Sequence, residues 1–184
     1  AGKLWTIKDI DDNRNRVYVS EAVDGKPPRY TGGGINIHPR IGEKMMEILC
    51  TDISFNYIDE KAKNVLDDMR RKYHYEALTV DERPIWIMKD KIIFEPFTGT
   101  VISKTLCWML RAIGLNATVV DGLGRIEVEH TSDFEWKFKQ IYREWSVDDI
   151  LQVTKQNEWF VSKYSSYLPK DMLLDMHTAH ELDI

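Results

Sequence analysis

The chain has 184 residues, of which 43% are hydrophobic and 11% aromatic, a composition that excludes a disordered protein. Its formal net charge of −5 argues against a protein whose whole surface binds duplex DNA, although a local basic face is compatible with that charge. No stretch approaches the roughly 20 apolar residues of a membrane span, and no segment has the pattern of a secretory signal. These properties predict a cytoplasmic protein with one domain or two small lobes.

The N-terminal residues 1–37 are expected to be rich in β-structure. Alternating apolar residues predict a strand over 3–9 and a return strand over 16–22, which together form a hairpin. The three consecutive glycines at 32–34 lack the Lys-Ser/Thr pair that completes a nucleotide-binding loop. We interpret them as a flexible bend, with close backbone approach to a nucleic-acid phosphate as the alternative.

Two amphipathic helices are expected next. Apolar residues at helical spacing predict one helix over 39–50, opened by Pro39, and another over 60–75, capped by Asp59. The basic run at 70–72 falls in the last turns of the second helix. We interpret this run as a complement to the helix dipole, with contact to a backbone phosphate as the alternative.

The segment 94–100 is expected to organise the middle of the chain. Apolar runs predict strands over 84–88 and 91–94 before it, and helical spacing predicts a helix over 101–113 after it. A proline and a glycine mark the corner between the last strand and the helix. A strand that enters a helix through a tight turn forms a rigid unit on which the neighbouring elements can pack.

The remaining residues predict further hairpin and helical elements. A hairpin is expected over 117–128, and capping-box patterns at Ser132 and Ser146 indicate two helix starts. Pro169 is expected to open a last short helix. The sequence therefore predicts an α+β fold, in which a β-rich part, 1–37, precedes helices packed on antiparallel hairpins in 38–184.

Few residues indicate catalysis or metal binding. His177 and His180 lie three apart, but we expect them in a solvent-exposed C-terminal segment rather than in a metal site. Cys50 and Cys107 are expected to be reduced, buried thiols. Among the six tryptophans, one or two are candidates for stacking on a nucleic-acid base, with burial in the core as the alternative. We predict no catalytic residue and no metal site on this chain.

Several segments, in the order of the chain, carry a resemblance to a known family. They are 5–11 (WTIKDID), 25–34 (GKPPRYTGGG), 38–45 (HPRIGEKM), 57–62 (YIDEKA), 94–100 (FEPFTGT), 163–164 with 167–173, and 182–184. Together they resemble the C-terminal region of the large helicase-related (Lhr-like) family of ATP-dependent DNA helicases of the DEAD/DEAH type. Glu95 and Phe97 depart from the Phe and Trp that are more usual in this family, and Val101 stands where Arg is frequent.

The resemblance implies an accessory role within a longer protein. The β-rich part would belong to a barrel-like module, and ATP and Mg would bind the motor domains of the parent helicase. This chain has no Walker A motif and no Asp-Glu-x-His box, so we do not expect it to hydrolyse ATP alone. Its expected role is to complete the channel for single-stranded DNA and to brace the motor domains in DNA repair. The alternative is a protein–protein docking domain without direct nucleic-acid contact.

Five residues are predicted to form a nucleic-acid-binding face: Trp5, Lys26, Arg29, Gly33 and Arg40. The indole would stack on a base, the three cations would neutralise phosphates, and the glycine would allow close backbone approach. The expected partners are single-stranded nucleic acid, with DNA as the expected form, and the helicase core domains of the same parent chain. No cofactor is expected on this chain itself.

Overall fold

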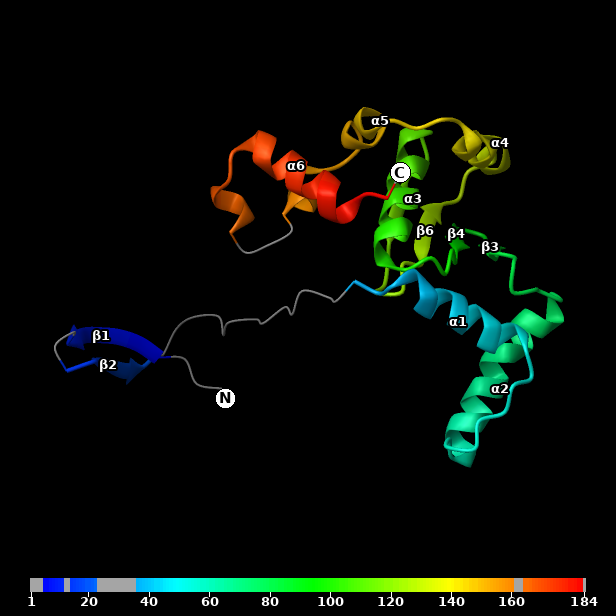
Figure 1. Ribbon diagram of the computed structural model, residues 1–184, viewed down its shortest axis with the longest axis horizontal. Helices are drawn as coiled ribbons and strands as arrows, with labels where there is room; N and C mark the ends of the chain where they lie inside the picture. Colours follow the sequence, from blue (N-terminus) through cyan, green and yellow to red (C-terminus); the bar gives the residue numbers. More distant parts are fainter. Residues whose placement is uncertain (1–4, 12–13, 23–35, 161–163, 184) are drawn as a thin grey trace. The chain divides into compact units, whose positions relative to one another are not determined.

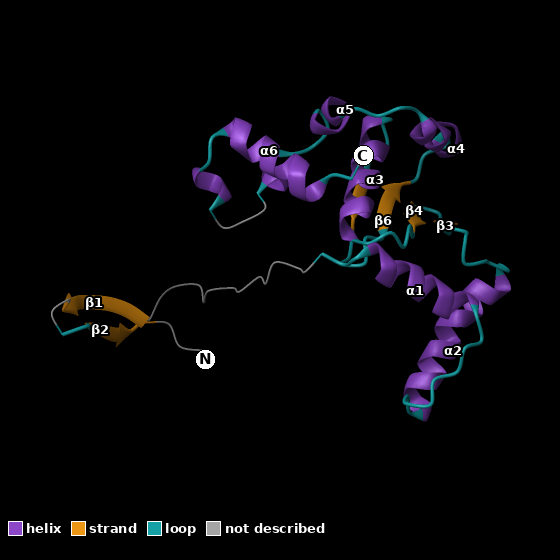
Figure 2. Cartoon of the chain, in the orientation of Figure 1, coloured by secondary structure: helices purple, strands orange, loops and turns teal. Residues whose placement is uncertain are grey.

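The strands and helices of the chain fall into two units, Ala1–Gly34 and Ile35–Ile184. The computed structural model describes residues 5–11, 14–22, 36–160 and 164–183. The first unit contains a β-hairpin, and the second combines a four-stranded antiparallel sheet with helices (Figure 1, Figure 2). The fold is therefore α+β, as the sequence predicts.

The hairpin of the first unit consists of β1 (Trp5–Asp11) and β2 (Arg16–Glu21). The two strands pair antiparallel, with Ile7 opposite Val19 and Ile10 opposite Val17. The register shifts between Ile7 and Asp9, and this β-bulge returns Ile10 to the face that Ile7 occupies. In the described residues this sheet has two strands and the other has four, and neither closes into the barrel-like module that the resemblance implies.

The sheet of the second unit has the strand order β3-β4-β6-β5. Its members are β3 (Ile85–Ile87), β4 (Lys91–Phe94), β5 (Ala117–Val119) and β6 (Ile126–Glu129). The helix α3 (Thr100–Ala112) packs on this sheet. Burial of apolar side chains between helix and sheet forms the main core. Its buried members are Ile92, Phe94, Cys107, Leu110, Leu115, Ala117, Ile126, Val128 and Phe134.

Two helices form a smaller core beside the sheet. The helix α1 (Pro39–Cys50) starts with its proline in the first turn, and α2 (Glu60–Tyr75) is capped by Asp59, whose Oδ1 accepts from the N–H of Ala62 at 2.7 Å. Both helix starts confirm the sequence predictions. The buried members of this core are Met46, Leu49, Tyr73 and Phe97.

Much of the apolar face of α2 is uncovered within the second unit. Val65 and Met69 lie on this face, and their exposed fractions are 55% and 51%. The buried residues of α2 are confined to its C-terminal half, where Tyr73 joins the smaller core. The helix α2 extends away from the sheet (Figure 1).

Short helices and one longer helix follow the sheet. They are α4 (Phe134–Phe138), η1 (Lys139–Tyr142), α5 (Val147–Leu151), η2 (Gln156–Trp159), η3 (Ser165–Tyr167) and α6 (Lys170–Glu181). Ser146 opens α5 with a reciprocal capping box to Asp149, as predicted. The box predicted at Ser132 is wrong, because Asp133 is the residue that precedes α4 and its carboxylate bonds Thr131 and Lys137 instead.

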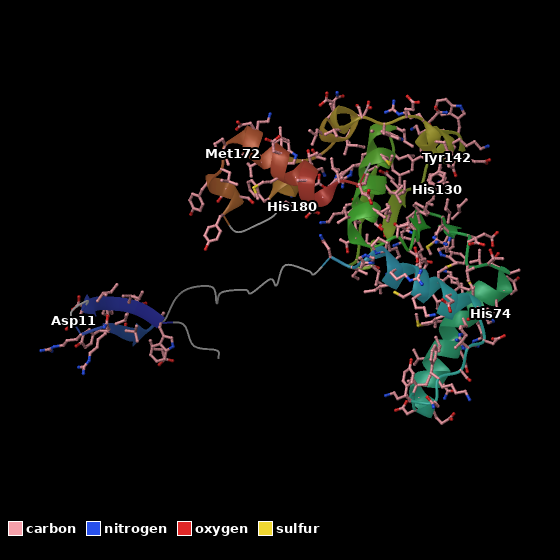
Figure 3. All side chains as sticks on the ribbon, in the orientation of Figure 1. Asp11, His74, His130, Tyr142, Met172 and His180 are labelled. Atoms are coloured by element: carbon pink, nitrogen blue, oxygen red, sulfur yellow. The ribbon has the colours of Figure 1, made fainter. Side chains whose placement is uncertain are left out.

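The C-terminal helix α6 packs on α3. His177 is fully buried, with its ring in edge contact with Trp108 at a centroid distance of 4.8 Å. Just after α6, the N–H of Asp183 donates to Oγ1 of Thr105 at 3.0 Å. The expectation of a solvent-exposed segment was therefore wrong for His177, since it follows Leu173 by one helical turn and both face the core. His180 lies on the exposed side of α6 (Figure 3).

None of the described helices combines the length and apolar character needed to cross a bilayer.

Candidate functional site

Two of the five residues predicted to bind nucleic acid lie in described parts of the chain. Trp5 belongs to β1 in the first unit and Arg40 to α1 in the second. Lys26, Arg29 and Gly33 lie outside the described residues. The structure therefore describes the surroundings of Trp5 and Arg40 separately.

Trp5 lies on an exposed apolar face of the hairpin. This hairpin face consists of Trp5, Ile7, Ile10, Val17 and Val19, whose exposed fractions range from 47% to 60%. Charges of both signs are balanced over the described hairpin, which carries Lys8, Arg14 and Arg16 with Asp9, Asp11 and Glu21. The indole is accessible for stacking, but its described surroundings form no basic patch.

Arg40 lies in the first turn of α1 with 84% of its side chain exposed. Its guanidinium donates to Oε2 of Glu43 at 3.1 Å. An exposed pair of this kind contributes little to stability, so the guanidinium is available to other anions. The shallow depression around it is balanced in charge, since it is lined by Arg40, Lys44 and Arg83 with Glu43, Glu47 and Asp81.

A pocket of about 200 Å³ lies at the turn that follows β4. Its walls come from α1, α2, this turn and the loop between β5 and β6. The apolar lining includes Met45, Leu49, Met69, Phe97 and Leu123. Pockets with mostly apolar walls and a few convergent polar groups are the usual form of binding sites, so this Glu95 pocket is the candidate site of the second unit.

Glu95 places a carboxylate in the wall of this pocket with 13% of its side chain exposed. Its Oε2 accepts from the hydroxyl of Tyr73 at 2.9 Å and from Nε1 of Trp86 at 2.6 Å. Its Oε1 lies 3.9 Å from Nη1 of Arg125, beyond hydrogen-bond distance. Burial and the neighbouring carboxylate raise the pKa of Tyr73, so its hydroxyl stays a donor.

A cation covers the outer face of this network. Nζ of Lys72 lies 3.4 Å from the centroid of the Trp86 ring, within the range of a cation–π contact. Burial lowers the pKa of Lys72, while the charge of Glu95 opposes this shift. Through Lys72, the basic run 70–72 thus places a positive charge near Glu95 without lining the pocket itself.

Close backbone contacts hold the turn beside the pocket. Phe97 adopts a positive φ of 51°, a region that side chains other than glycine rarely occupy. Gly42 of α1 lies against it, and a Cβ atom there would be 2.2 Å from the carbonyl oxygen of Phe97. Gly99 has φ of 81°, and its added Cβ would meet the carbonyl oxygen of Ile37 at 2.4 Å. The predicted strand–turn–helix is confirmed, and it depends on these two glycines.

A second cavity of about 310 Å³ lies between α3 and the C-terminal segments. Nη1 of Arg111 donates to both carboxylate oxygens of Glu158 at 2.8 and 3.0 Å, and its Nε donates to the carbonyl of Ala117 at 2.7 Å. Burial raises the pKa of Cys107 to about 11, so this thiol is a poor nucleophile near neutral pH. The ionic groups are internally paired, and the cavity is best explained as part of the packing.

Arg70 has a structural role that its sequence context did not reveal. It is 6% exposed, and it donates from Nε to the carbonyl of Ile48 at 2.9 Å and from Nη2 to the carbonyl of Ile53 at 2.8 Å. Both alternatives for the run 70–72, dipole complement and phosphate contact, are therefore wrong for Arg70. The available signal was its spacing, since Arg70 shares a helical face with Leu66 and Tyr73.

The described residues contain no group of three or more His, Cys, Asp or Glu side chains arranged to hold a metal ion.

Comparisons with known proteins identify no relative of this chain. No family model, no curated protein and no solved structure matches the chain.

Proposed function

We propose that this chain is an accessory domain of an Lhr-like ATP-dependent DNA helicase and braces the motor domains by docking against them. The observation that supports this most directly is the exposed apolar hairpin face around Ile10. ATP and Mg would bind the motor domains of the parent protein, and this chain would not hydrolyse ATP alone. The expected setting is cytoplasmic DNA repair.

The two described strands of the first unit do not cover this face themselves. A two-stranded sheet is marginally stable in water unless further strands or a helix cover its apolar side. Each large apolar side chain contributes about 1.5–3 kcal/mol when it moves from full exposure to full burial, so covering the half-exposed hairpin face is strongly favourable. The family resemblance supplies the partner, namely the helicase core of the parent chain.

The charge of the second unit supports bracing over enclosure of DNA. Residues 35–184 hold 25 of the 30 acidic side chains but only 19 of the 25 basic ones. A surface of net negative charge repels the phosphate backbone that dominates nonspecific nucleic-acid affinity. Direct docking on protein is therefore the better-supported part of the expected role.

Contact with single-stranded DNA is the second candidate function. The specific observation in its favour is the indole of Trp5, which is 56% exposed on the hairpin face. Stacking of a base on an aromatic ring contributes about 1–3 kcal/mol and tolerates any sequence. Stacking on this indole alone would give weak, nonspecific contact alongside docking.

The docking proposal is tested with two variants of the hairpin. Ile10→Lys places a charge on the apolar face, while Tyr18→Lys places it on the opposite face, where the side chain is 46% exposed. Binding to the separately purified helicase core is measured by calorimetry. We expect Ile10→Lys to weaken binding at least about tenfold and Tyr18→Lys to have little effect. Equal affinities for all three chains would contradict docking through this face.

The single-strand proposal is tested by anisotropy of a fluorescein-labelled oligonucleotide over a salt series. Arg40→Ala is expected to lower the slope of log affinity against log salt by about one, and Trp5→Ala to weaken binding without changing that slope. Lys139→Ala is the matched control, since this exposed lysine pairs with Glu135 as Arg40 pairs with Glu43. Absence of binding by the unmodified chain at low salt would remove this candidate and leave docking.

A further inference from the structure

The Glu95 pocket offers one hydrogen-bond acceptor that the described residues leave available. We propose that it receives a cationic side chain, with arginine preferred, from a protein partner. This inference rests on the proposed docking function and assigns a specific anchor to the second unit.

The acceptor is Oε1 of Glu95. Tyr73 and Trp86 both donate to Oε2, which uses the two lone pairs of that oxygen. Oε1 lies 3.9 Å from the nearest guanidinium nitrogen of Arg125 and has no donor within hydrogen-bond distance among the described residues. Charged donors form the stronger hydrogen bonds to a carboxylate oxygen, so this acceptor favours a cation over a neutral donor.

The carboxylates of the lining favour a donor over an anion. Nη2 of Arg125 lies 2.9 Å from Oδ2 of Asp121, so the charge of this arginine is shared between two carboxylates. Glu95 and Asp121 line the pocket with Arg125, and Lys72, which lies on the Trp86 ring, adds a second positive charge near Glu95. An incoming guanidinium would therefore bind through the free oxygen of Glu95, whereas an incoming phosphate would meet two carboxylates.

The walls fit a long aliphatic stem with a planar end. Met45 and Met69 are flexible and adapt to the shape of an inserted chain. Arginine and lysine both bury their methylene stems along apolar surfaces while the charged end meets an acceptor. Tyr73 and Phe97 are also among the lining residues, and a planar guanidinium packs on aromatic surfaces better than the compact ammonium of lysine.

The pocket continues into the uncovered face of α2. Met69 lines the pocket, is 51% exposed, and follows the exposed Val65 by about one helical turn. A partner segment that covers this apolar face would therefore present side chains directly over the pocket. The amino group of a free nucleobase would also donate to Oε1, but a nucleobase would leave the apolar face of α2 uncovered.

The first test uses small ligands on the unmodified, isotope-labelled chain. N-acetylarginine amide is titrated while the indole N–H resonance of Trp86, which bonds Glu95, is followed by NMR. We expect a saturable shift, with N-acetylcitrulline amide, the uncharged isostere, at least about tenfold weaker. Citrulline equal to arginine, a shift with guanosine but none with arginine, or no shift at all would each overturn the inference.

The second test uses matched variants. Glu95→Gln keeps an oxygen acceptor for Tyr73 and Trp86 but removes the charge, and it is expected to weaken arginine binding at least about tenfold. Met69→Trp fills the pocket from its exposed wall and is expected to have the same effect. Glu127→Gln is the control, because this carboxylate pairs with Lys91 outside the pocket. Wild-type affinity in Glu95→Gln would overturn the inference.

The hairpin variant separates this inference from the proposed function. Ile10→Lys should leave the arginine titration unchanged even where it abolishes docking on the helicase core. If the unmodified chain docks on the helicase core but does not bind arginine, only the pocket assignment is overturned. If the unmodified chain binds arginine but does not dock on the helicase core, only the proposed partner is wrong.

Discussion

Replacement of Arg70 by methionine removes the donor that ties α2 to the carbonyl groups of Ile48 and Ile53. The guanidinium is nearly fully buried, and its nearest carboxylate, on Asp67, lies 3.9 Å away on an exposed side chain. Methionine matches the stem of the arginine side chain in length and apolar character. The change therefore removes the hydrogen bonds while it keeps the packing of the stem.

The expected loss follows from the two bonds. A hydrogen bond from a charged donor contributes about 1.5–3 kcal/mol, and a buried carbonyl without a partner costs about 1–3 kcal/mol. Ile53 is 40% exposed, so water can reach its carbonyl after a small movement, which reduces the loss there. We therefore expect Arg70→Met to lower the free energy of unfolding by about 2–4 kcal/mol.

The measurement is urea unfolding followed by tryptophan fluorescence. The control is Arg71→Met, since Arg71 is 75% exposed in its side chain and pairs only with the exposed Asp68 among the described ion pairs. We expect this control to change the free energy of unfolding by less than about 0.5 kcal/mol. A loss in Arg70→Met no larger than that of Arg71→Met would refute the structural role of the buried guanidinium.

Two further predictions concern α6 and the turn at the pocket. Burial lowers the pKa of His177 against the opposing charge of Glu181, so its stabilising contribution is complete above the unfolded-state pKa of about 6.5 and is lost as pH falls below it. His177→Phe should reduce the loss of stability between about pH 7 and about pH 5 in urea titrations, and an identical loss would contradict this. Gly42→Ala should lower the thermal midpoint measurably through its clash with Phe97, unlike Gly122→Ala, where an added Cβ meets nothing within 4 Å. Equal midpoints for the two glycine variants would refute that reasoning.

Local chemistry explains which elements were predictable. The caps at Asp59 and Ser146 and the hairpin over 117–128 depend on residues that are neighbours in sequence. Their hydrogen bonds and backbone angles are fixed by side chains within a few positions. The α+β class follows from the order of these elements.

Residues whose role depends on distant parts of the chain were not predictable in the same way. Arg70 and Arg71 are identical in type and adjacent, yet one is buried and the other exposed, because helical rotation turns only Arg70 toward the loop after α1. His177 is buried because α6 returns to α3, about seventy residues earlier in the chain.

The Glu95 pocket could not be predicted from the sequence either, because its walls come from distant parts of the chain. The Glu95 pocket joins Met45 of α1 to Leu123 of the loop after β5, and no local motif relates these positions. The segment 94–100 marked the right neighbourhood, but the acceptor oxygen became apparent only from the bonds of Tyr73 and Trp86. The nucleic-acid face stays a prediction, since it combines Trp5 and Arg40 with three residues outside the described ranges.

The contact between α6 and α3 has a consequence for the order of folding. The bond from Asp183 to Thr105 spans 78 residues, so it closes one of the longest loops in the second unit. Closure of long loops is slow, and helices and hairpins with local contacts form earlier. In a nascent chain, the face of α3 that contains Trp108 would therefore stay exposed until nearly all of α6, which covers it, had left the ribosome. During this interval the central helix of the unit is a natural binding surface for chaperones and for misfolded contacts.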